Sequence, residues 1–350
     1  MKTKVVTIHP NQVEVAKMKE AAALIARGEL VAFPTETVYG LGGDALRPEA
    51  AKKIYEAKGR PSDNPLIVHI SEYADLQRIA KEIPPQAKAL SDAFWPGPLT
   101  MIVKKKDTVP DTTTGGMDTV AVRMPNHPVA LALIRESGCL IAAPSANTSG
   151  RPSPTEASHV AEDMEGRIPM ILDGGPVGIG IESTIIDLTE EKPMVLRPGY
   201  ITPEMLSEVL QEEVMIDPGL IASDDTKKPK APGMKYRHYA PKAQLVIVDG
   251  EPSDVVEKIN ELVQAKKRQG QKIAVIATEE SCGSYDADVV LCIGKRTDED
   301  QIAQHLYKLL RECDSLEADF IYSECFQTPR IGQAIMNRLL KAAGHTVIKV

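Results

Sequence analysis

Short apolar runs alternate with segments of helical period along most of the chain. In the first 211 residues, apolar runs of strand length predict strands at 30–34, 66–70, 99–105, 119–124, 139–144, 183–188 and 194–198. Helical spacing predicts helices at 13–27, 48–58, 86–94, 128–136 and 203–211. Strands that alternate with helices indicate an α/β fold around a mixed sheet, although the pattern does not give the strand order.

This pattern stops at residues 215–242, whose prolines and glycines predict a connection between two domains. Beyond it, strands are predicted at 244–250, 272–278, 288–294, 318–324 and 346–350, with helices at 252–268, 298–313 and 332–343. Strands separated by helices of this length predict a small, parallel, doubly wound (Rossmann-like) α/β sheet. We therefore expect a larger domain over 1–212, a linker over 213–242 and a smaller domain over 243–350.

Length and composition are those of a globular protein with two domains: 350 residues, 43% hydrophobic and 26% charged. The net charge of −8 argues against a protein whose main task is to grip nucleic acid, but residues 227–242 carry six Lys or Arg and no acid. No apolar run approaches the roughly 18 to 20 residues that cross a bilayer, and the five cysteines form no CxxC. We expect a cytoplasmic protein with no membrane segment and with reduced thiols.

A run of hydroxyls, a carboxylate and glycines follows the first of these strands, in PTETVYGLGGDA at 34–45. Loops at strand ends bind ligands in open α/β sheets, and glycine lets a backbone amide come close to a substrate. Thr35, Thr37 and Tyr39 supply more polar groups than a turn requires. The alternative is a tight turn that binds nothing.

Two cations, Lys58 and Arg60, flank Gly59 directly after a predicted helix. If Gly59 bends the chain, both cations can face one polyanion, and Arg60 can bind a phosphate or carboxylate through two nitrogens. The alternative is that they interact only with the helix dipole or with solvent. His69, on the strand that follows, is by itself more typical of a core histidine than of a ligand.

A third polar segment, AAPSANTSGRPSPT at 142–155, also follows an apolar strand. Its hydroxyl and amide groups can bind phosphate oxygens, a carboxylate or a purine edge, unless they only satisfy one another within a turn. Arg123 and Arg197 are single arginines near other strand ends. The glycines at 174–180 precede a strand rather than a helix, which argues against a dinucleotide-binding fingerprint.

The sequence contains no GxxxxGK[ST], HExxH or GxSxG motif, and no closely spaced His, Cys and Asp residues that would form a structural metal site. Covalent catalysis therefore has little support. The polar segments instead suit a site that positions a nucleotide or another polyanion and stabilises charge at phosphorus.

Seven segments, in the order PTETVYGLG, KGRPxxNPLIVH, WPGPLT, VAVRMP, APSANTSG, ESTIID and LRPG, resemble the YrdC-type domain of threonylcarbamoyl-AMP synthases over about the first 205 residues. The segment with KYRHYAP and the α/β domain after it resemble the two-domain form of that family. The resemblance implies a nucleotidyltransferase that converts L-threonine, bicarbonate and ATP, with Mg²⁺, into L-threonylcarbamoyl-AMP and pyrophosphate. The product would pass to a tRNA threonylcarbamoyl transferase complex that modifies the adenosine beside the anticodon, and the enzyme itself could contact tRNA.

The resemblance also implies which residues line the site. On the ATP side they are Lys58, Arg60, Ser62, Thr119, Ser145, Asn147, Ser153, Arg197 and His238. On the threonine side they are Thr35, His69, Arg123, Ala143 through its backbone, and Ser183. Lys58 and Arg60 would neutralise phosphates, and Arg123 would pair with the carboxylate of threonine. Mg²⁺ would be held mainly through the nucleotide.

His238 lies in the basic segment, which in the two-domain family folds over the active site; there it would exclude water and protect the labile mixed anhydride. Two alternatives remain. YrdC-type domains have a basic concave face linked to double-stranded RNA, so an RNA-binding module would show salt-sensitive RNA affinity without consuming ATP. Carbamoyl transfer to another protein, as in hydrogenase-maturation factors, is the second, but those proteins carry Cys-rich zinc segments that this sequence lacks.

Overall fold

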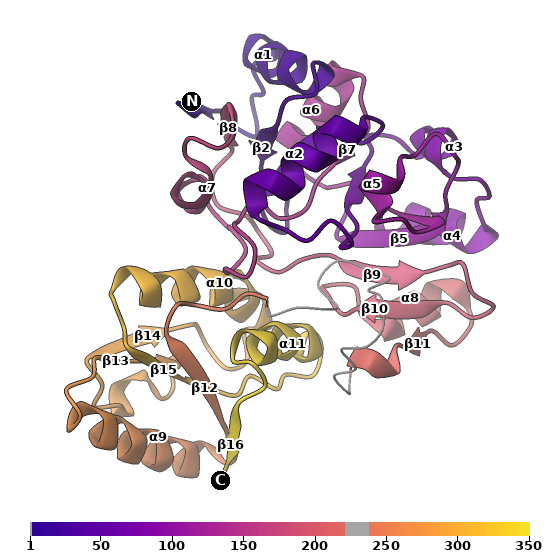
Figure 1. The fold of residues 1–350 in the computed structure, drawn as a ribbon. Helices are drawn as coiled ribbons and strands as arrows, with labels where there is room; N and C mark the ends of the chain where they lie inside the picture. Colours follow the sequence, from indigo (N-terminus) through magenta and orange to yellow (C-terminus); the bar gives the residue numbers. More distant parts are fainter. Residues whose placement is uncertain (1, 221–237) are drawn as a thin grey trace. The chain divides into compact units, whose positions relative to one another are not determined.

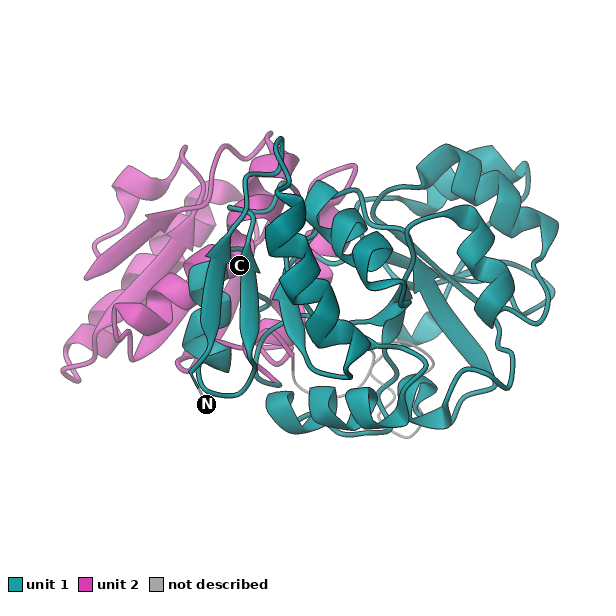
Figure 2. Cartoon of the chain, turned by 90° about the horizontal axis from the view of Figure 1, so that it is seen from above, with its two compact units in different colours: residues 1–149, 153–178, 182–236 teal, residues 150–152, 179–181, 237–350 magenta. Residues whose placement is uncertain are grey.

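The computed structural model describes residues 2–220 and 238–350, which form two compact units (Figure 2). Unit 1 comprises Met1–Ser149, Ser153–Gly178 and Glu182–Tyr236, and unit 2 comprises Gly150–Pro152, Ile179–Ile181 and Arg237–Val350. The division at 212 and 242 stays a prediction. Most of the basic segment at 227–242 lies outside the described residues.

Unit 1 is built on one mixed sheet (Figure 1). Its strands are β1 (Lys4–Thr7), β2 (Val31–Phe33), β3 (Gly40–Asp44), β4 (Ile67–His69), β5 (Leu99–Lys104), β6 (Thr119–Arg123), β7 (Ile141–Ala142), β8 (Met170–Asp173), β9 (Thr184–Asp187), β10 (Met194–Arg197) and β11 (Met215–Ile216). They lie in the order β1-β8-β2-β3-β7-β4-β6-β5-β9-β10-β11. The prediction of a mixed sheet is confirmed, and this order brings together strands that are far apart in the sequence.

Helices cover both faces of this sheet. They are α1 (Val15–Ala26), α2 (Pro48–Lys58), α3 (Leu76–Ile79), α4 (Pro85–Phe94), α5 (Asp111–Thr114), α6 (Pro128–Ser137), α7 (Ala157–Met164) and α8 (Pro203–Leu210), with 3₁₀ turns η1 (Tyr73–Asp75) and η2 (Pro218–Leu220). Along β2, Val31 and Phe33 pack in the core of α1 and α6, whereas Ala32 between them packs in the core of α2. Both faces of the strand are therefore buried, as its uninterrupted apolar run predicts.

Helix α2 has the bounds that its sequence predicts. Pro48 is preorganised for the first helical turn, and Glu49 and Lys58 place opposite charges at the two ends of the helix dipole. Gly59 ends the helix with a φ of 59°, a left-handed conformation that glycine adopts without a Cβ penalty. The chain therefore bends between Lys58 and Arg60, as predicted.

Strand β3 is one element that the sequence did not predict; β1, α7, β8 and β11 are others. The glycine-rich residues 40–44 were expected in a ligand-facing loop, but they form a buried strand between β2 and β7. A Cβ atom at Gly42 would lie 2.7 Å from side-chain atoms of both Phe33 and Ile141. Glycine is required here for close packing inside the sheet, not for contact with a substrate. Only 34–39 form the connecting loop.

Unit 2 has a five-stranded parallel sheet, in the order β14-β13-β15-β12-β16. Its elements are β12 (Gln244–Asp249), α9 (Pro252–Lys267), β13 (Ile273–Ala277), η3 (Cys282–Ser284), β14 (Val289–Cys292), α10 (Glu299–Ser315), β15 (Phe320–Glu324), α11 (Gly332–Ala342) and β16 (Val347–Lys349). Figure 1 shows α9 on one face of the sheet and α10 and α11 on the other. The doubly wound α/β prediction is confirmed.

Two short segments join unit 2 from earlier in the chain. Gly150 accepts a hydrogen bond from the backbone N–H of Ala240 at 2.8 Å, and the buried Arg311 donates to the carbonyl of Pro152 at 2.6 Å. Backbone carbonyls of residues 150–152 therefore accept hydrogen bonds within unit 2, one of them from a buried arginine. Sequence patterns cannot reveal this, because the contacts join positions about 90 to 160 residues apart.

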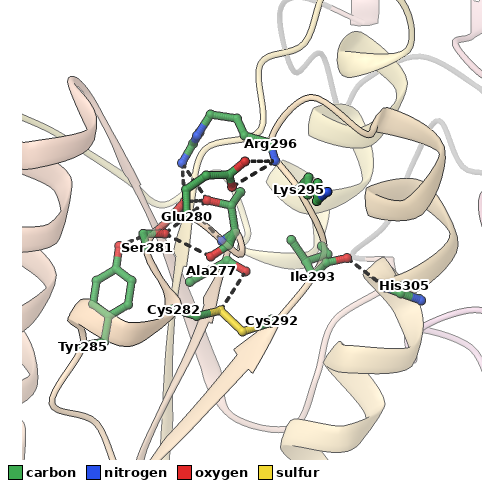
Figure 3. Close-up of a disulfide and its surroundings, with 12 residues drawn as sticks. Ala277, Glu280, Ser281, Cys282, Tyr285, Cys292, Ile293, Lys295, Arg296 and His305 are labelled. Atoms are coloured by element: carbon green, nitrogen blue, oxygen red, sulfur yellow. Dashed lines mark hydrogen bonds and ion pairs between the residues drawn. A yellow bond between two sulfur atoms is a disulfide. The ribbon is translucent and has the colours of Figure 1, made fainter.

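Cys282 and Cys292 form a disulfide between the segment after β13 and the neighbouring strand β14 (Figure 3). The prediction of reduced thiols is wrong for this pair, since the parallel pairing of β13 and β14 brings together two cysteines with no sequence motif. Cys139, Cys313 and Cys325 are free. Within residues 2–220 and 238–350, no helix has the length and apolar character needed to span a bilayer.

Replacing Gly42 with Ala tests the close packing of β3. We expect a loss of about 1 to 3 kcal/mol in unfolding free energy, because the added methyl group displaces Phe33 or Ile141 in a packed core. Urea unfolding followed through Trp95, the single tryptophan of the chain, reports on unit 1. Gly178→Ala is the matched control, since its Cβ would meet nothing closer than 4.0 Å. Equal midpoints for both variants would contradict this account of β3.

Candidate functional site

The loop 34–39, which joins β2 to β3, is held by its own hydroxyl groups. Thr35 Oγ1 accepts hydrogen bonds from the N–H groups of Thr37 and Val38, both at 3.2 Å, and donates to the Val38 carbonyl at 2.6 Å. The Thr35 and Thr37 hydroxyls share a further bond of 2.9 Å. Both side chains are buried. Thr35 thus builds a local turn, and its hydrogen bonds hold Thr37 in place.

Arg123, the last residue of β6, connects this loop to the centre of the sheet. Its Nη1 donates to Thr37 Oγ1 at 2.9 Å, and its Nε donates to the carbonyl of Gly97 at 3.3 Å. Its Nη2 lies 2.7 Å from Oε1 of Glu36, and the Arg123 side chain is only 4% exposed. A guanidinium held at three points in this way presents a fixed positive charge.

His69 is the register partner of Arg123 on the adjacent parallel strand β4. Its ring is buried, with Nδ1 3.2 Å from the Ile67 carbonyl and an edge-on contact to Phe33. Burial and then the neighbouring charge of Arg123 lower the pKa of His69 to about 3. His69 is therefore neutral at neutral pH, and it can offer a hydrogen bond or shape to a ligand but no charge.

A second buried group joins β5, β9 and β10. Thr100 lies opposite Arg123 on β5, and its hydroxyl is 2.8 Å from Ser183 Oγ at the start of β9. Arg197, at the end of β10, donates to Ser183 Oγ at 3.1 Å and to its carbonyl at 3.0 Å. All three side chains are buried. Ser183 therefore joins Arg197 to Thr100, the strand partner of Arg123.

Lys58 is buried, with an exposed fraction of 2%, and its ammonium donates to the carbonyls of Ser145 and Asn147. Ser145 Oγ in turn donates to the side-chain oxygen of Asn147 at 2.6 Å, and the Ser149 N–H donates to the Lys58 carbonyl at 2.9 Å. The cation thus organises the 145–149 loop. The alternative that Lys58 is merely solvated is wrong.

The remaining residues expected on the ATP side differ in their surroundings. Arg60 donates to the carbonyls of Asn64 and Pro65, which folds the KGRP segment back on itself. Ser62 is exposed on that segment. Thr119 begins β6, at the opposite end of the strand from Arg123. Ser153 is fully buried and donates to Glu182 Oε1 at 2.6 Å.

The backbone of Tyr39 joins the residues around Arg123 to the residues around Lys58. Its backbone N–H donates to the Pro154 carbonyl at 2.9 Å, and its own carbonyl accepts from the Ala146 N–H at 2.8 Å. The loop that bonds to Arg123 is thereby joined to the loop that Lys58 organises. The N–H of Ala143 donates to the Ile67 carbonyl at 2.9 Å, so a backbone role for Ala143 falls to its carbonyl oxygen.

Sequence reasoning gave no role to Glu36, Thr100 and Glu182, although each contacts a predicted site residue. Glu36 lies in PTETVYGLGGDA, the segment predicted to bind a ligand, so its carboxylate could have been proposed as a site residue from the sequence. Thr100 and Glu182 give no such signal. His238 belongs to unit 2, where its ring packs 5.5 Å from that of Tyr239.

An α/β unit whose strand-end loops gather buried cations, hydroxyls and a carboxylate defines a protein that binds a small charged ligand. Two family models match the chain: one described as "Telomere recombination" over residues 23–199, and one described as "Threonylcarbamoyl-AMP synthase, C-terminal domain" over residues 201–344. The chain belongs to the threonylcarbamoyl-AMP synthase family.

Individual relatives agree with this assignment. The threonylcarbamoyl-AMP synthase of Bacillus subtilis is 52% identical over 95% of this chain and 94% of its own length, and that of Pyrococcus abyssi is 52% identical over 97% of each. A crystal structure of P. abyssi Sua5 complexed with L-threonine superposes with a TM-score of 0.94 at 50% identity, covering 99% of this chain and 100% of that one.

The buried, neutral state of His69 gives a prediction about pH. Because the pKa of His69 falls from 6.5 to about 3 on folding, only the unfolded chain takes up this proton between those values. This contribution to stability is complete above about pH 6.5 and is lost as pH falls toward 3, by up to about 1.4 kcal/mol per pH unit.

We expect the free energy of unfolding of the wild type, minus that of His69→Gln, to decrease as the pH is lowered from about 7 to about 5. Urea unfolding followed through Trp95 measures both proteins under identical conditions, so that the carboxylates common to both cancel. A constant difference across this range would show that His69 takes up its proton as readily in the folded chain as in the unfolded chain.

Proposed function

We propose that this protein synthesises L-threonylcarbamoyl-AMP from L-threonine, bicarbonate and ATP, with release of pyrophosphate, at the polar site of unit 1. The observation that carries the proposal is the 52% identity to curated threonylcarbamoyl-AMP synthases over nearly the whole chain. The buried arrangement around Arg123 and Lys58 supports it, because it provides separate positive groups for an amino acid and for a triphosphate.

On the threonine side, Arg123 binds the carboxylate of the amino acid. Its guanidinium is prevented from turning by Thr37 and Gly97, so the ligand meets a preorganised donor. Thr35, the neutral His69, the Ala143 carbonyl and Ser183 surround the same ligand. The crystal structure of P. abyssi Sua5 complexed with L-threonine, at 50% identity, supports L-threonine as the ligand.

On the ATP side, Lys58 and Arg60 offset phosphate charge, and Ser145 and Asn147 contribute polar atoms from the loop that Lys58 holds. Ser62, Thr119, Ser153 and Arg197 complete the proposed ATP-side set of unit 1, and an ATP contact of His238 stays a prediction. Since Lys58 already donates to two carbonyls, we expect it to contact phosphate while it keeps the loop in place. Its role is then both structural and electrostatic.

The reaction needs no protein nucleophile. A carbamate oxygen of the threonine carbamate forms a bond to the α-phosphorus of ATP, and the bond from that phosphorus to the oxygen bridging to the β-phosphate breaks, releasing pyrophosphate. Mg²⁺, when bound, would neutralise charge on the triphosphate. In the described part of the chain, no group of three or more His, Cys, Asp or Glu could hold a metal ion.

The product is a labile mixed anhydride, so it calls for a second enzyme that accepts it promptly. We propose that it passes to a tRNA threonylcarbamoyl transferase complex in the cytoplasm, with or without direct contact between this chain and tRNA. The alternative of an RNA-binding module without adenylate chemistry is not favoured, because the curated relatives are named as synthases.

The activity is tested by incubating the full chain with ATP, L-threonine and bicarbonate. Mass spectrometry detects the adenylate product, and the release of pyrophosphate over time gives the reaction rate. We expect Lys58→Ala to lower kcat/KM by about 100-fold or more, since it removes a phosphate contact and frees the 145–149 loop. Lys53→Ala is the matched control on the same helix, because Lys53 pairs with Glu29 at the surface. If Lys58→Ala and Lys53→Ala have the same kcat/KM, the proposed role of Lys58 is refuted.

The division of the site into two sides gives a separate prediction. Ser183→Ala removes the hydroxyl that joins Thr100 to Arg197. We expect it to raise KM for threonine about tenfold, the effect of one lost hydrogen bond to a charged group, while KM for ATP changes much less. Initial rates at saturating ATP and then at saturating threonine separate the two constants. A larger increase in KM for ATP than in KM for threonine would show that Ser183 belongs to the ATP side of the site.

A further inference from the structure

Glu36 lies on the connection between β2 and β3, and the proposed site gives it no role so far. Its side chain is 13% exposed, and its Oε1 lies 2.7 Å from Nη2 of Arg123. The other donors of Arg123 are held by Thr37 and Gly97, so Nη2 is the nitrogen left facing Glu36. A buried carboxylate is thus placed beside the cation assigned to the substrate.

The contact is an ion pair without an aligned hydrogen bond. Among the residues that the structure describes, none donates a hydrogen bond to either carboxylate oxygen of Glu36, and Nη2 of Arg123 has no hydrogen-bond acceptor. Buried polar atoms are nearly always hydrogen-bonded, and a buried ion pair needs such bonds to offset the lost hydration of its charges. The Glu36–Arg123 pair can therefore bind a ligand that donates a hydrogen bond to Glu36 and accepts one from Nη2 of Arg123.

An α-amino acid has this chemistry, because its ammonium and its carboxylate are attached to the same carbon. We propose that Glu36 binds the α-amino group of L-threonine while Arg123 binds its carboxylate, so that the pair recognises the zwitterion at both charges. This inference rests on the proposed function, which assigns Arg123 to the threonine carboxylate. Adding the zwitterion brings one positive and one negative charge, so the buried site stays neutral overall.

The contact can persist through the reaction. The ammonium has three N–H groups, the neutral amine has two, and the carbamate nitrogen keeps one, so each form can donate to Glu36. Glu36 would hold the neutral amine in one place while its nitrogen bonds to the bicarbonate carbon; the C–O bond to the bicarbonate hydroxyl breaks, and the hydroxide leaves as water with one proton of the amine. Because it contacts the amino group and not the side chain, Glu36 selects α-amino acids over hydroxy acids, and it does not select threonine over serine.

A purely structural role makes a different prediction. If Glu36 only neutralises Arg123, its removal changes stability but does not alter the preference between ligands. The two roles are therefore separated by comparing L-threonine with 3-hydroxybutyrate, which has the carboxylate and the hydroxyl of threonine but no amino group. Both ligands contact Arg123 equally, and only threonine offers a donor to Glu36.

The test is calorimetric titration of the full chain with each ligand, on the wild type and on Glu36→Gln. We expect the wild type to bind L-threonine about 10- to 100-fold more tightly than 3-hydroxybutyrate, the effect of one hydrogen bond to a charged group. In Glu36→Gln this ratio should approach one, mainly through weaker threonine binding. In steady-state assays KM for threonine should rise by a similar factor, with KM for ATP unchanged.

Glu29→Gln is the matched control, because Glu29 is a half-exposed carboxylate that pairs with Lys53 and precedes β2, whereas the loop with Glu36 follows that strand. It should keep the wild-type ratio. A Glu36→Gln protein that folds, by its Trp95 fluorescence, and keeps the full ratio would overturn the inference. If that variant does not fold, the wild type alone tests the inference. Equal affinity of the wild type for 3-hydroxybutyrate and for L-threonine would then overturn it. Wild type that makes no adenylate at all would instead contradict the proposed function.

Discussion

The burial of the Arg123 guanidinium is the constraint around which the rest of the site is arranged. A charge that is only 4% exposed needs hydrogen-bond acceptors or an opposite charge around it; here Thr37 and Gly97 accept hydrogen bonds, and Glu36 supplies the opposite charge. Thr37 and Glu36 lie in the loop 34–39, Gly97 lies in the segment before β5, and Arg123 itself ends β6. Meeting the needs of one cation therefore fixes the relative positions of three segments, and the same charge lowers the pKa of the neighbouring His69.

Lys58 plays a corresponding part on the other side of the site. Its ammonium is directed inward, against the carbonyls of Ser145 and Asn147, by a helix that ends at Gly59. A loop rich in Ser, Thr and Asn could satisfy its own hydrogen bonds in several ways, and the buried cation selects one of them. Tyr39 then joins this loop to the loop bonded to Arg123. Both halves of the site are in this way parts of one hydrogen-bonded structure.

Most secondary structure elements could be predicted from the sequence, because apolar period and helix signals act locally. Helix α2 is the clearest case, since its proline, its charged ends and its final glycine all indicate the same bounds. Strand β3 could not be predicted, because three glycines among five residues read as a loop unless Phe33 and Ile141 are known to press against them. The Cys282–Cys292 disulfide was missed for the same reason, since it depends on which strands are neighbours.

The sequence by itself determined the two α/β units, the candidate segments and, through ordered motifs, the family. These depend on local spacing, which a linear chain displays directly. Only the tertiary structure decided how the charged groups are paired: Lys58 with the loop near Asn147, Ser183 with Arg197, and Glu36 with Arg123. Such pairs depend on distance and on the absence of water. Both are set by the way the sheet brings distant strand ends together, and no property of a single segment encodes them.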